Sequence, residues 1–443
     1  MRFLAPLISL VALWVMPAVA QEFTTLKGHG GPIMDIAVAP DGTVVTASFD
    51  NSVGVWRDGV PTWLEGHEAA VVAIDASSQP GVLSGGDDFR VLSLHPEIST
   101  EDLGVITKHM GKVSDVAYSP ETTYFASASW DGTIHLVSVG EYLLNRSNHG
   151  VPYEARVLTG HSSGVTSIGF LRDDVLFSAS SDGTVRIWER KNDSFESRPI
   201  VKQGFGINEL IVSDDWLAYG AVDGGTRIVH PVTGEQIADF TLDRRPILSM
   251  AYHADTDQLA VGDGHGYIMM IDTTAWKITR DFRATRKGPV WALAFSNDGK
   301  TIWAGGLDDV AYGWPVDSLD KFDPAMGQDR SFLKAADTMP NGERQFMRKC
   351  SICHALEEGP SRKAGPTMHG IFGRRAGTVP GYSYSDILDG SDIIWDETTI
   401  DALFDQGPDH YIPGSKMPMQ VIAKPQDRAD LITFLKDTTV QGD

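Results

Sequence analysis

The chain repeats itself about every 40 residues through its first 318 positions. The clearest copy begins at Gly160-His161, passes a turn at Asp182 and ends at Trp188. Six other copies keep the same interval from a turn residue to a final apolar position, and successive turn residues lie 38 to 51 positions apart. Apolar residues alternate within each copy, which predicts short strands. A repeat of this length with four strands predicts one blade of a closed β-propeller.

The seven copies resemble the WD-repeat family, and the resemblance implies an all-β, seven-bladed propeller over residues 21–318. We expect Phe23 to Lys27 to supply the outer strand of the last blade, because closing the ring removes exposed sheet edges. In this family the histidine of each Gly-His pair bonds the turn aspartate of its own blade. His161 and Asp182 are therefore expected to form a structural pair instead of a metal site. An insertion near 141–156 accounts for the longest spacing and is expected on the surface.

Residues 1–20 have the pattern of a secretory signal peptide. Arg2 precedes an apolar stretch from Phe3 to Val15, and the segment ends in the small residues Ala18-Val19-Ala20. The apolar stretch is too short to span a bilayer comfortably, and no later stretch approaches 18 apolar residues. We therefore expect a periplasmic protein with no membrane span after cleavage. The formal net charge of −22 repels a phosphate backbone, so we expect no nucleic-acid partner.

Both cysteines of the chain lie in one pentapeptide, Cys350-Ser351-Ile352-Cys353-His354. On a helical turn, two thiols three positions apart can add to the two vinyl groups of one haem, and the adjacent imidazole can then reach the iron. A zinc knuckle would need two more ligands at similar spacing, and a thioredoxin-like motif would need a βαβ context. Neither pattern is present. The pentapeptide predicts one covalent haem c held by Cys350 and Cys353, with His354 as an iron ligand.

Residues 340–443 resemble class I cytochromes c of the mitochondrial-like branch, an all-α family. One motif that carries the resemblance is the loop from Gly365-Pro366 to Arg374. By that match, the carbonyl of Pro366 accepts the second ring N–H of His354, which fixes the tautomer of the ligand. The whole chain is thus expected to be multidomain, with residues 319–339 linking the propeller to an all-α cytochrome c domain.

The two ends of the cytochrome-like segment predict helices that cross. Gly342 and Phe346 are expected to pack against Leu431 and Phe434, and the glycine allows the two backbones to approach closely.

The sixth iron ligand is expected in the loop from Tyr411 to Met419. Alignment with the family's Ile-Pro-Gly-x-Lys-Met pattern selects Met417. Met419 is the near rival, and His369 and His410 are the nearby histidines that could replace a methionine. A His and Met pair leaves no open coordination position, which suits one-electron transfer better than oxygen or small-ligand chemistry.

Family matching places Arg374, Tyr384, Trp395 and Ser415 around the haem propionates. For Tyr384 and Trp395, simple core packing is the alternative. Leu403 stands where the family usually has a tyrosine that hydrogen-bonds the axial sulfur, so we expect either a weaker bond from methionine to iron or a different reduction potential. From residue 341 onward the chain has 15 acidic and 11 basic side chains, net −4, so the family's lysine-rich docking rim is not expected.

These features favour an electron carrier over a catalyst. The haem would cycle between ferric and ferrous, and the propeller would dock redox partner proteins. The alternative is a periplasmic redox enzyme, dehydrogenase-like or nitrite-reductase-like, whose propeller holds a second cofactor. A third class is a redox or haem-delivery sensor whose haem state alters what the propeller binds.

Overall fold

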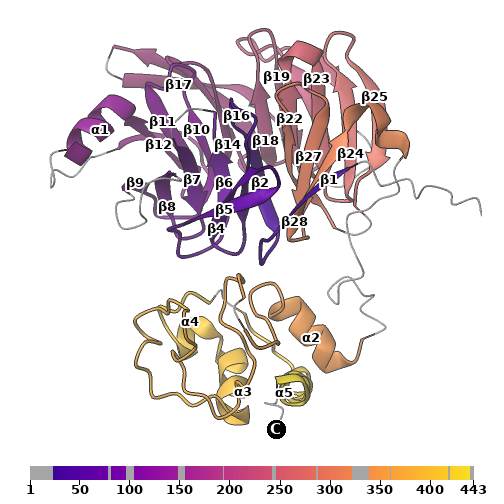
Figure 1. The fold of residues 1–443 in the computed structure, drawn as a ribbon. Helices are drawn as coiled ribbons and strands as arrows, with labels where there is room; N and C mark the ends of the chain where they lie inside the picture. The colour runs from indigo at the N-terminus through magenta and orange to yellow at the C-terminus, as the bar shows by residue number, and fades with distance from the viewer. Residues whose placement is uncertain are drawn as a thin grey trace, which may run out of the picture.

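The structure is a computed structural model in which residues 23–77, 81–95, 104–147, 155–192, 194–241, 246–285, 288–321, 339–359, 361–417 and 420–439 are described. The expected signal peptide, most of the expected linker and the rival ligand Met419 lie outside these residues. Figure 1 shows a ring of strands followed by a smaller helical domain. An all-β propeller followed by an all-α domain is therefore confirmed.

Seven four-stranded sheets make up the described part of the ring, and neighbouring strands within each sheet are antiparallel. Blade 1 contains β2 (Ile33–Val38), β3 (Val44–Ser48), β4 (Ser52–Arg57) and β5 (Val60–Glu65), and blade 2 contains β6 (Val71–Asp75), β7 (Val82–Gly86), β8 (Arg90–Leu94) and β9 (Val105–Lys108). Blade 3 contains β10 (Val113–Tyr118), β11 (Tyr124–Ser129), β12 (Thr133–Ser138) and β13 (Arg156–Thr159). Blade 4 contains β14 (Val165–Arg172), β15 (Val175–Ser180), β16 (Thr184–Lys191) and β17 (Ser194–Lys202).

Blades 5 to 7 complete the ring, and the seventh takes its outer strand from the other end of the propeller sequence. Blade 5 contains β18 (Ile207–Val212), β19 (Leu217–Ala221), β20 (Thr226–Val229) and β21 (Gln236–Asp239). Blade 6 contains β22 (Ile247–His253), β23 (Gln258–Asp263), β24 (Tyr267–Asp272) and β25 (Lys277–Arg283). Blade 7 contains β26 (Val290–Phe295), β27 (Thr301–Gly306), β28 (Val310–Pro315) and β1 (Thr24–Lys27).

Strand β1 closes the ring by pairing antiparallel with β28, so that Leu26 lies opposite Ala311. Leu26 is only 3% exposed and packs in the core between the first and last blades. This confirms the expected role of residues 23–27. The pairing covers the edge that β28 would otherwise present to other chains.

The core lies between successive blades. Each innermost strand begins with a fully buried β-branched residue that packs against a small residue of the blade before it. A Cβ on Gly85 of β7, for example, would lie 3.0 Å from the Cβ of Val113. The blades therefore pack closely, because a branched side chain on the innermost strand of one blade faces glycine or alanine on the second strand of the blade before it.

The Gly-His histidines are structural, as expected. The Nδ1 of His161 lies 3.1 Å from Asp182, its Nε2 lies 2.7 Å from the Oγ of Ser178, and the indole N–H of Trp188 donates to the same hydroxyl at 2.8 Å. The corresponding residues of blade 1 repeat this network. Each network satisfies polar groups inside a blade, so these histidines are not available as metal ligands.

Helix α1 (Val139–Ser147) opens the insertion between β12 and β13, which the sequence analysis treated as a loop. Tyr142 anchors it, because its buried ring packs edge-on against Phe125 of β11. Two 3-10 turns, η2 (Ala254–Thr256) and η3 (Val316–Lys321), complete the described propeller. In the described residues no helix is both long and apolar enough to cross a membrane.

The helical domain contains α2 (Asn341–Lys349), α3 (Glu397–Gln406), α4 (Pro408–Tyr411) and α5 (Pro425–Thr439). As expected, α2 and α5 cross at Gly342, where an added Cβ would lie 2.8 Å from the Cβ of Phe434. The rings of Phe346 and Phe434 lie 5.5 Å apart. This crossing holds α2 in place, and the haem-binding pentapeptide follows directly from its last turn.

Candidate haem site

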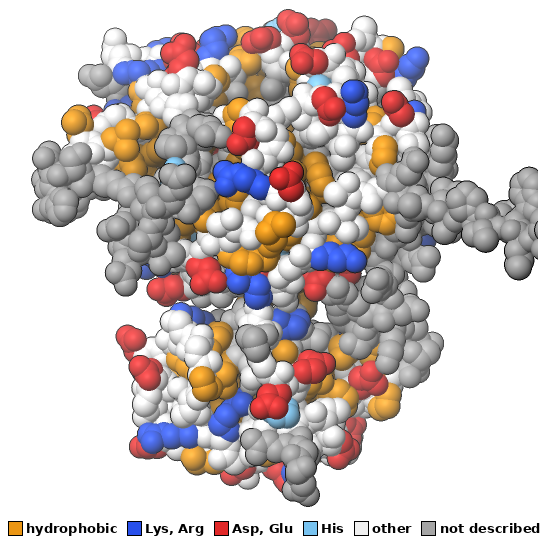
Figure 2. Space-filling view, in the orientation of Figure 1, with side chains coloured by type: hydrophobic (Ala, Val, Ile, Leu, Met, Phe, Trp, Pro, Cys, Tyr) orange, Lys and Arg blue, Asp and Glu red, His pale blue; other side chains and the backbone are white. Residues whose placement is uncertain are grey.

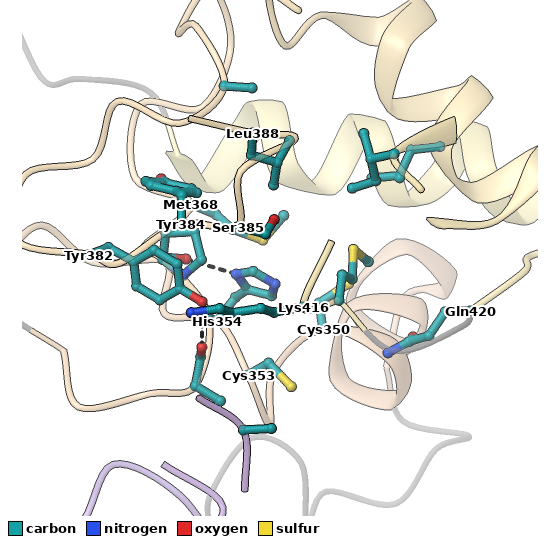
Figure 3. Close-up of a pocket in the computed structure, with 18 of the residues that line it drawn as sticks. Cys350, Cys353, His354, Met368, Tyr382, Tyr384, Ser385, Leu388, Lys416 and Gln420 are labelled. Carbon is teal, nitrogen blue, oxygen red and sulfur yellow. Dashed lines mark hydrogen bonds between the residues drawn. The ribbon is translucent and has the colours of Figure 1, made fainter. Parts of the chain in front are cut away.

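The pentapeptide after α2 turns back on itself and places both cysteines and the histidine around one space (Figure 3). The backbone N–H groups of Cys353 and His354 both donate to the carbonyl of Cys350, at 3.0 and 2.9 Å. These short-range bonds fix the three side chains relative to one another. All three line a cavity of about 320 Å³.

His354 has one nitrogen engaged and the other available. Its Nδ1 lies 2.7 Å from the carbonyl oxygen of Pro366. A carbonyl accepts hydrogen bonds only, so Nδ1 carries the proton and Nε2 carries the lone pair. Burial lowers the pKa of His354, which keeps the imidazole neutral. A neutral imidazole with its lone pair on Nε2 is the form that binds a metal.

The two thiols lie in an apolar environment. Burial raises the pKa of Cys350 to about 12 and that of Cys353 to about 11. The other walls of the cavity are largely apolar and include Leu388, Ile400, Leu403 and Phe404. Such a cavity suits a large flat apolar ring rather than a hydrated ion.

Two polar side chains that the cytochrome domain contributes to the cavity wall have no hydrogen-bond partner among the described residues. They are the Oγ of Ser385 and the Oε1 of Gln420, both buried. Buried polar atoms are normally satisfied, so orphaned ones mark a place where another group belongs. Together with the two thiols and the neutral imidazole, they show that the residues present fit a haem.

Eight of the nine residues proposed from the sequence line this one cavity: Cys350, Cys353, His354, Pro366, Arg374, Tyr384, Trp395 and Met417. Ser415 lies in the same loop as Met417 but does not line the cavity. His369 and His410, considered as other ligands, do not line it either.

Arg374 holds the loop that carries Pro366. Its two terminal nitrogens donate to the carbonyls of His369 and Thr367, each at 2.7 Å. The phenol oxygen of Tyr384 accepts from the backbone N–H of Val379 at 3.3 Å. Contacts of Arg374, Tyr384, Trp395 and Ser415 with propionates stay predictions.

Residues of the propeller also line the cavity, which the sequence analysis did not foresee. They come from the turns of blades 1 and 2 and include Phe49, Asn51, Glu68, Asp87 and Phe89.

Tyr382 is a further cavity residue that the sequence analysis did not identify. Its hydroxyl donates to the carbonyl of Ala364 at 2.7 Å and holds the loop before Pro366 in place.

Comparison with known proteins agrees with this geometry. A model of the family "Cytochrome c" matches residues 340–439, and a model of the "WD domain, G-beta repeat" matches 20–57, 100–138 and 153–189. Cytochrome c of Sesamum indicum is 47% identical over 100 residues, which are 22% of this chain and 88% of the relative. Cytochrome c of Guizotia abyssinica is 42% identical over 112 residues, which are 25% of this chain and 98% of the relative.

Solved structures resemble the propeller. The WD40 β-propeller domain of Doa1 superposes with a TM-score of 0.57 at 18% identity, covering 66% of this chain and 94% of that one. The structure of U3-55K gives a TM-score of 0.58 at 19% identity, covering 67% and 99%. At these identities the likeness shows the fold alone. The matches and the pocket together show that the chain belongs to the cytochrome c family through its C-terminal domain, which carries one covalent haem c bound through Cys350 and Cys353 and follows a seven-bladed WD-repeat propeller.

Proposed function

We propose that this protein is an exported one-electron carrier whose haem iron would be held by His354 and Met417. Haem binding and electron transfer follow from membership of the cytochrome c family. The pair of iron ligands, the export and the docking role of the propeller are what we propose in addition. The observation that carries the proposal is the shared cavity: His354, both cysteines and Met417 line the same space. His354 and Met417 would together hold the iron, and a haem so held would supply one-electron transfer without binding a substrate.

The chain's own residues prepare that site. Pro366 keeps the lone pair of His354 on the nitrogen that is free to bind iron. The apolar side chains of the cavity exclude water, which reduces the reorganisation that accompanies a change of charge. Leu403, 7% exposed, cannot donate a hydrogen bond to the sulfur of Met417, so that sulfur would lack the hydrogen bond that the family's tyrosine usually supplies.

The export proposal rests on residues 1–20, and it agrees with the haem chemistry because bacteria attach haem c outside the cytoplasm. The propeller is proposed to dock redox partner proteins, as propellers of this repeat family commonly bind proteins. A docking module beside the haem raises the local concentration of a donor or acceptor.

The test is to express the whole chain in a bacterium that matures c-type haem and to purify it from the periplasm. We expect one haem per chain, a mature N-terminus at Gln21 and sharp ferrous absorption bands. A haem-free protein, or a chain retained in the cytoplasm, contradicts the proposal. A second chromophore would support the other candidate, a periplasmic redox enzyme with a second cofactor in its propeller. The described residues contain no group of three or more His, Cys, Asp or Glu side chains placed to hold a metal ion.

A further inference from the structure

The propeller forms one side of the haem cavity, although about 300 positions separate the residues involved. Phe49 and Asn51 come from the turn between β3 and β4, Glu68 from the turn between β5 and β6, and Phe89 from the turn between β7 and β8. These turns share one end of blades 1 and 2. In Figure 2, basic and acidic side chains meet at the junction of the two domains.

Asn51 and Phe89 occupy a backbone conformation that favours glycine. Their φ angles are 71° and 69°. At the same position of the turn, blades 3 to 6 have Gly132, Gly183, Gly224 and Gly266, all with positive φ. A side chain in this region costs about 1 kcal/mol relative to glycine, and a bulky one is a clear outlier. Asparagine tolerates this conformation better than most residues, so the backbone penalty is larger at Phe89 than at Asn51.

The residues at these two turns both line the haem cavity. The Oδ1 of Asn51 is buried and has no hydrogen-bond partner among the described residues. Strained residues and orphaned polar atoms that coincide at one cavity indicate a ligand-contacting role.

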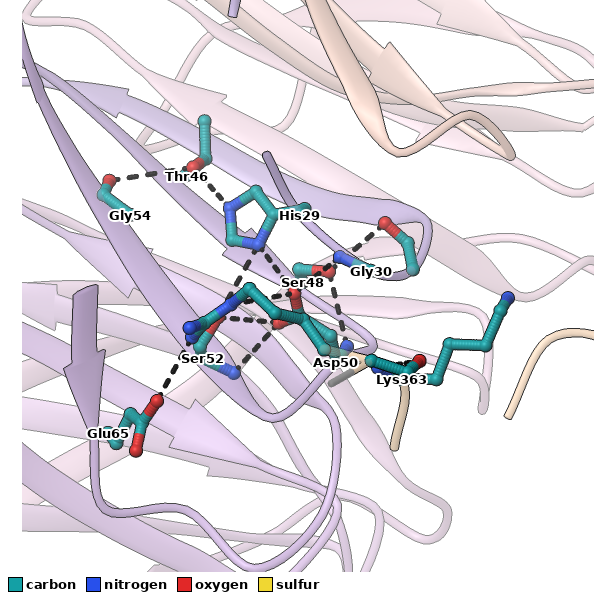
Figure 4. Close-up of polar contacts among 12 residues, drawn as sticks. His29, Gly30, Thr46, Ser48, Asp50, Ser52, Gly54, Glu65 and Lys363 are labelled. Carbon is teal, nitrogen blue, oxygen red and sulfur yellow. Dashed lines mark hydrogen bonds and ion pairs between the residues drawn. The ribbon is translucent and has the colours of Figure 1, made fainter. Parts of the chain in front are cut away.

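The two domains approach each other closely at Gly30. An added Cβ there would lie 2.6 Å from the carbonyl oxygen of Arg362 and 2.7 Å from the amide nitrogen of Lys363 (Figure 4). Gly30 itself has no positive φ. The residues that follow the histidine in blades 2 to 4 are Glu68, Met110 and Ser162, so the propeller tolerates a side chain at this position. Only the approach of the cytochrome domain requires glycine in blade 1.

Arg362 links the domains through charge and stacking. Its guanidinium lies 4.2 Å from the centre of the Trp63 ring, 3.1 Å from Glu65 and 3.9 Å from the buried carboxylate of Asp50. A guanidinium placed over tryptophan and beside a carboxylate is a strong surface pairing. Arg362 also lies three positions before Gly365, which packs against His354.

Further basic residues of the cytochrome domain gather at the same face. Lys349, Arg374, Arg375 and Lys416 line the cavity, together with Glu68, Asp87 and Lys112 of the propeller. Within the propeller, Asp87 pairs with Lys112 and Glu68 with Arg90. Among the described residues, the ion pairs that join the two domains are therefore those of Arg362, and they help to orient one domain on the other.

We infer that the turns of blades 1 and 2 form a wall of the haem pocket, with Asn51 and Phe89 as haem-contacting residues that shield the haem from solvent. The inference rests on the covalent haem but not on its proposed role as a carrier. Shielding disfavours the more highly charged ferric form and so raises the reduction potential. It also slows reduction by small molecules that reach the haem from solution.

The test uses the full chain loaded with haem. Photochemically reduced riboflavin supplies one electron to the ferric haem while absorbance reports the rate, and a separate titration reports the potential. In Gly30→Ala, the added methyl group separates the domains, so we expect a several-fold faster reduction and a lower potential. The matched control is Gly140→Ala, at a glycine without positive φ and with nothing within 4 Å of its Cβ.

A second pair of variants separates shielding from a general loss of structure. Asn51→Gly relieves backbone strain, so the thermal stability of the propeller should hold or rise while the haem becomes more accessible. The control is Asn192→Gly, which relieves similar strain at φ 56° on an exposed hairpin of blade 4. Rates and potentials equal to those of the wild type in both Gly30→Ala and Asn51→Gly overturn the inference. Loss of haem from the wild type itself would instead overturn the proposed function.

Discussion

The Nδ1 of His354 lies 2.7 Å from the carbonyl oxygen of Pro366, and Gly365 packs against the same imidazole. A Cβ at position 365 would lie 2.7 Å from Nδ1 and 2.9 Å from the carbonyl oxygen of Cys353. The loop therefore orients the ring by a hydrogen bond on one nitrogen and by the close approach of Gly365.

Gly365→Ala should displace the imidazole and reduce the amount of haem-loaded protein. The added methyl group has no room, because it meets both the ring and the backbone of the haem motif. Covalent haem per chain, measured by absorbance after denaturation, checks this. Gly381→Ala is the control: it lies in open space at φ 75°, so it should cost about 1 kcal/mol in stability and leave haem loading intact.

Met417→Ala should abolish the weak ferric absorption band that marks a methionine sulfur on iron, because Met417 lines the cavity. Met419→Ala should keep the band. Absorption spectra of the two ferric variants check this prediction. The reverse pattern would assign Met419 as the ligand, and a band retained in both variants would exclude either methionine.

Gly342→Ala should destabilise the cytochrome domain by about 1–3 kcal/mol, as expected for overpacking. The methyl group would overlap the carbonyl of Asp430 and press on Phe434, so helices α2 and α5 would have to separate. Unfolding in denaturant, followed through the haem absorption, gives the free energy of unfolding. Thr433→Ala, at an exposed position of α5, is the matched control and should change little. An unchanged midpoint in Gly342→Ala would contradict the close helix crossing.

Leu26→Ala should destabilise the propeller by about 2–4 kcal/mol, because it removes a buried side chain from the strand that closes the ring. Lys27→Ala in the same strand is exposed and should have little effect. Thermal unfolding followed by tryptophan fluorescence compares the two variants. Equal melting temperatures would mean that strand β1 does not hold the ring closed.

The contribution of His109 to the stability of the propeller should fall as the pH falls from about 6.5 to about 4. Burial, aided by the stacked His135 at 3.7 Å, lowers the pKa of His109 to about 4, although Asp131 favours the charged form. The unfolded chain takes up a proton near pH 6.5 and the folded chain does not, so each pH unit in this window costs up to about 1.4 kcal/mol. His109→Gln removes this pH-dependent contribution to the free energy of unfolding. The stability of this variant should therefore approach that of the wild type as the pH falls. A constant difference in stability between His109→Gln and the wild type across this pH range would contradict the prediction.

The centre of the haem site was predictable from sequence because its chemistry is local. Two thiols and an imidazole must sit on one turn, so the spacing of Cys350, Cys353 and His354 carries the information directly. The propeller was predictable for a similar reason, since each blade repeats the same short-range pattern of strand, turn and Gly-His pair.

The contact between the domains was not predictable, because it depends on how the linker places two folded units. Glu65 and Arg362 are paired in space but lie 297 positions apart. A signal was nevertheless present: Asn51 and Phe89 stand at a turn position where blades 3 to 6 have glycine. Helix α1 was also missed, because its packing depends on one buried side chain, Tyr142, and not on a long periodic pattern.

The most direct test of the proposed carrier is an anaerobic redox titration of the haem-loaded chain, repeated under carbon monoxide. With His354 and Met417 both on iron, we expect a single one-electron transition at the same potential in both titrations, because no coordination position is open. A second redox transition, or a potential that rises under carbon monoxide as the gas binds ferrous iron, would contradict the account. Either result would indicate an open or additional site and would favour a redox enzyme.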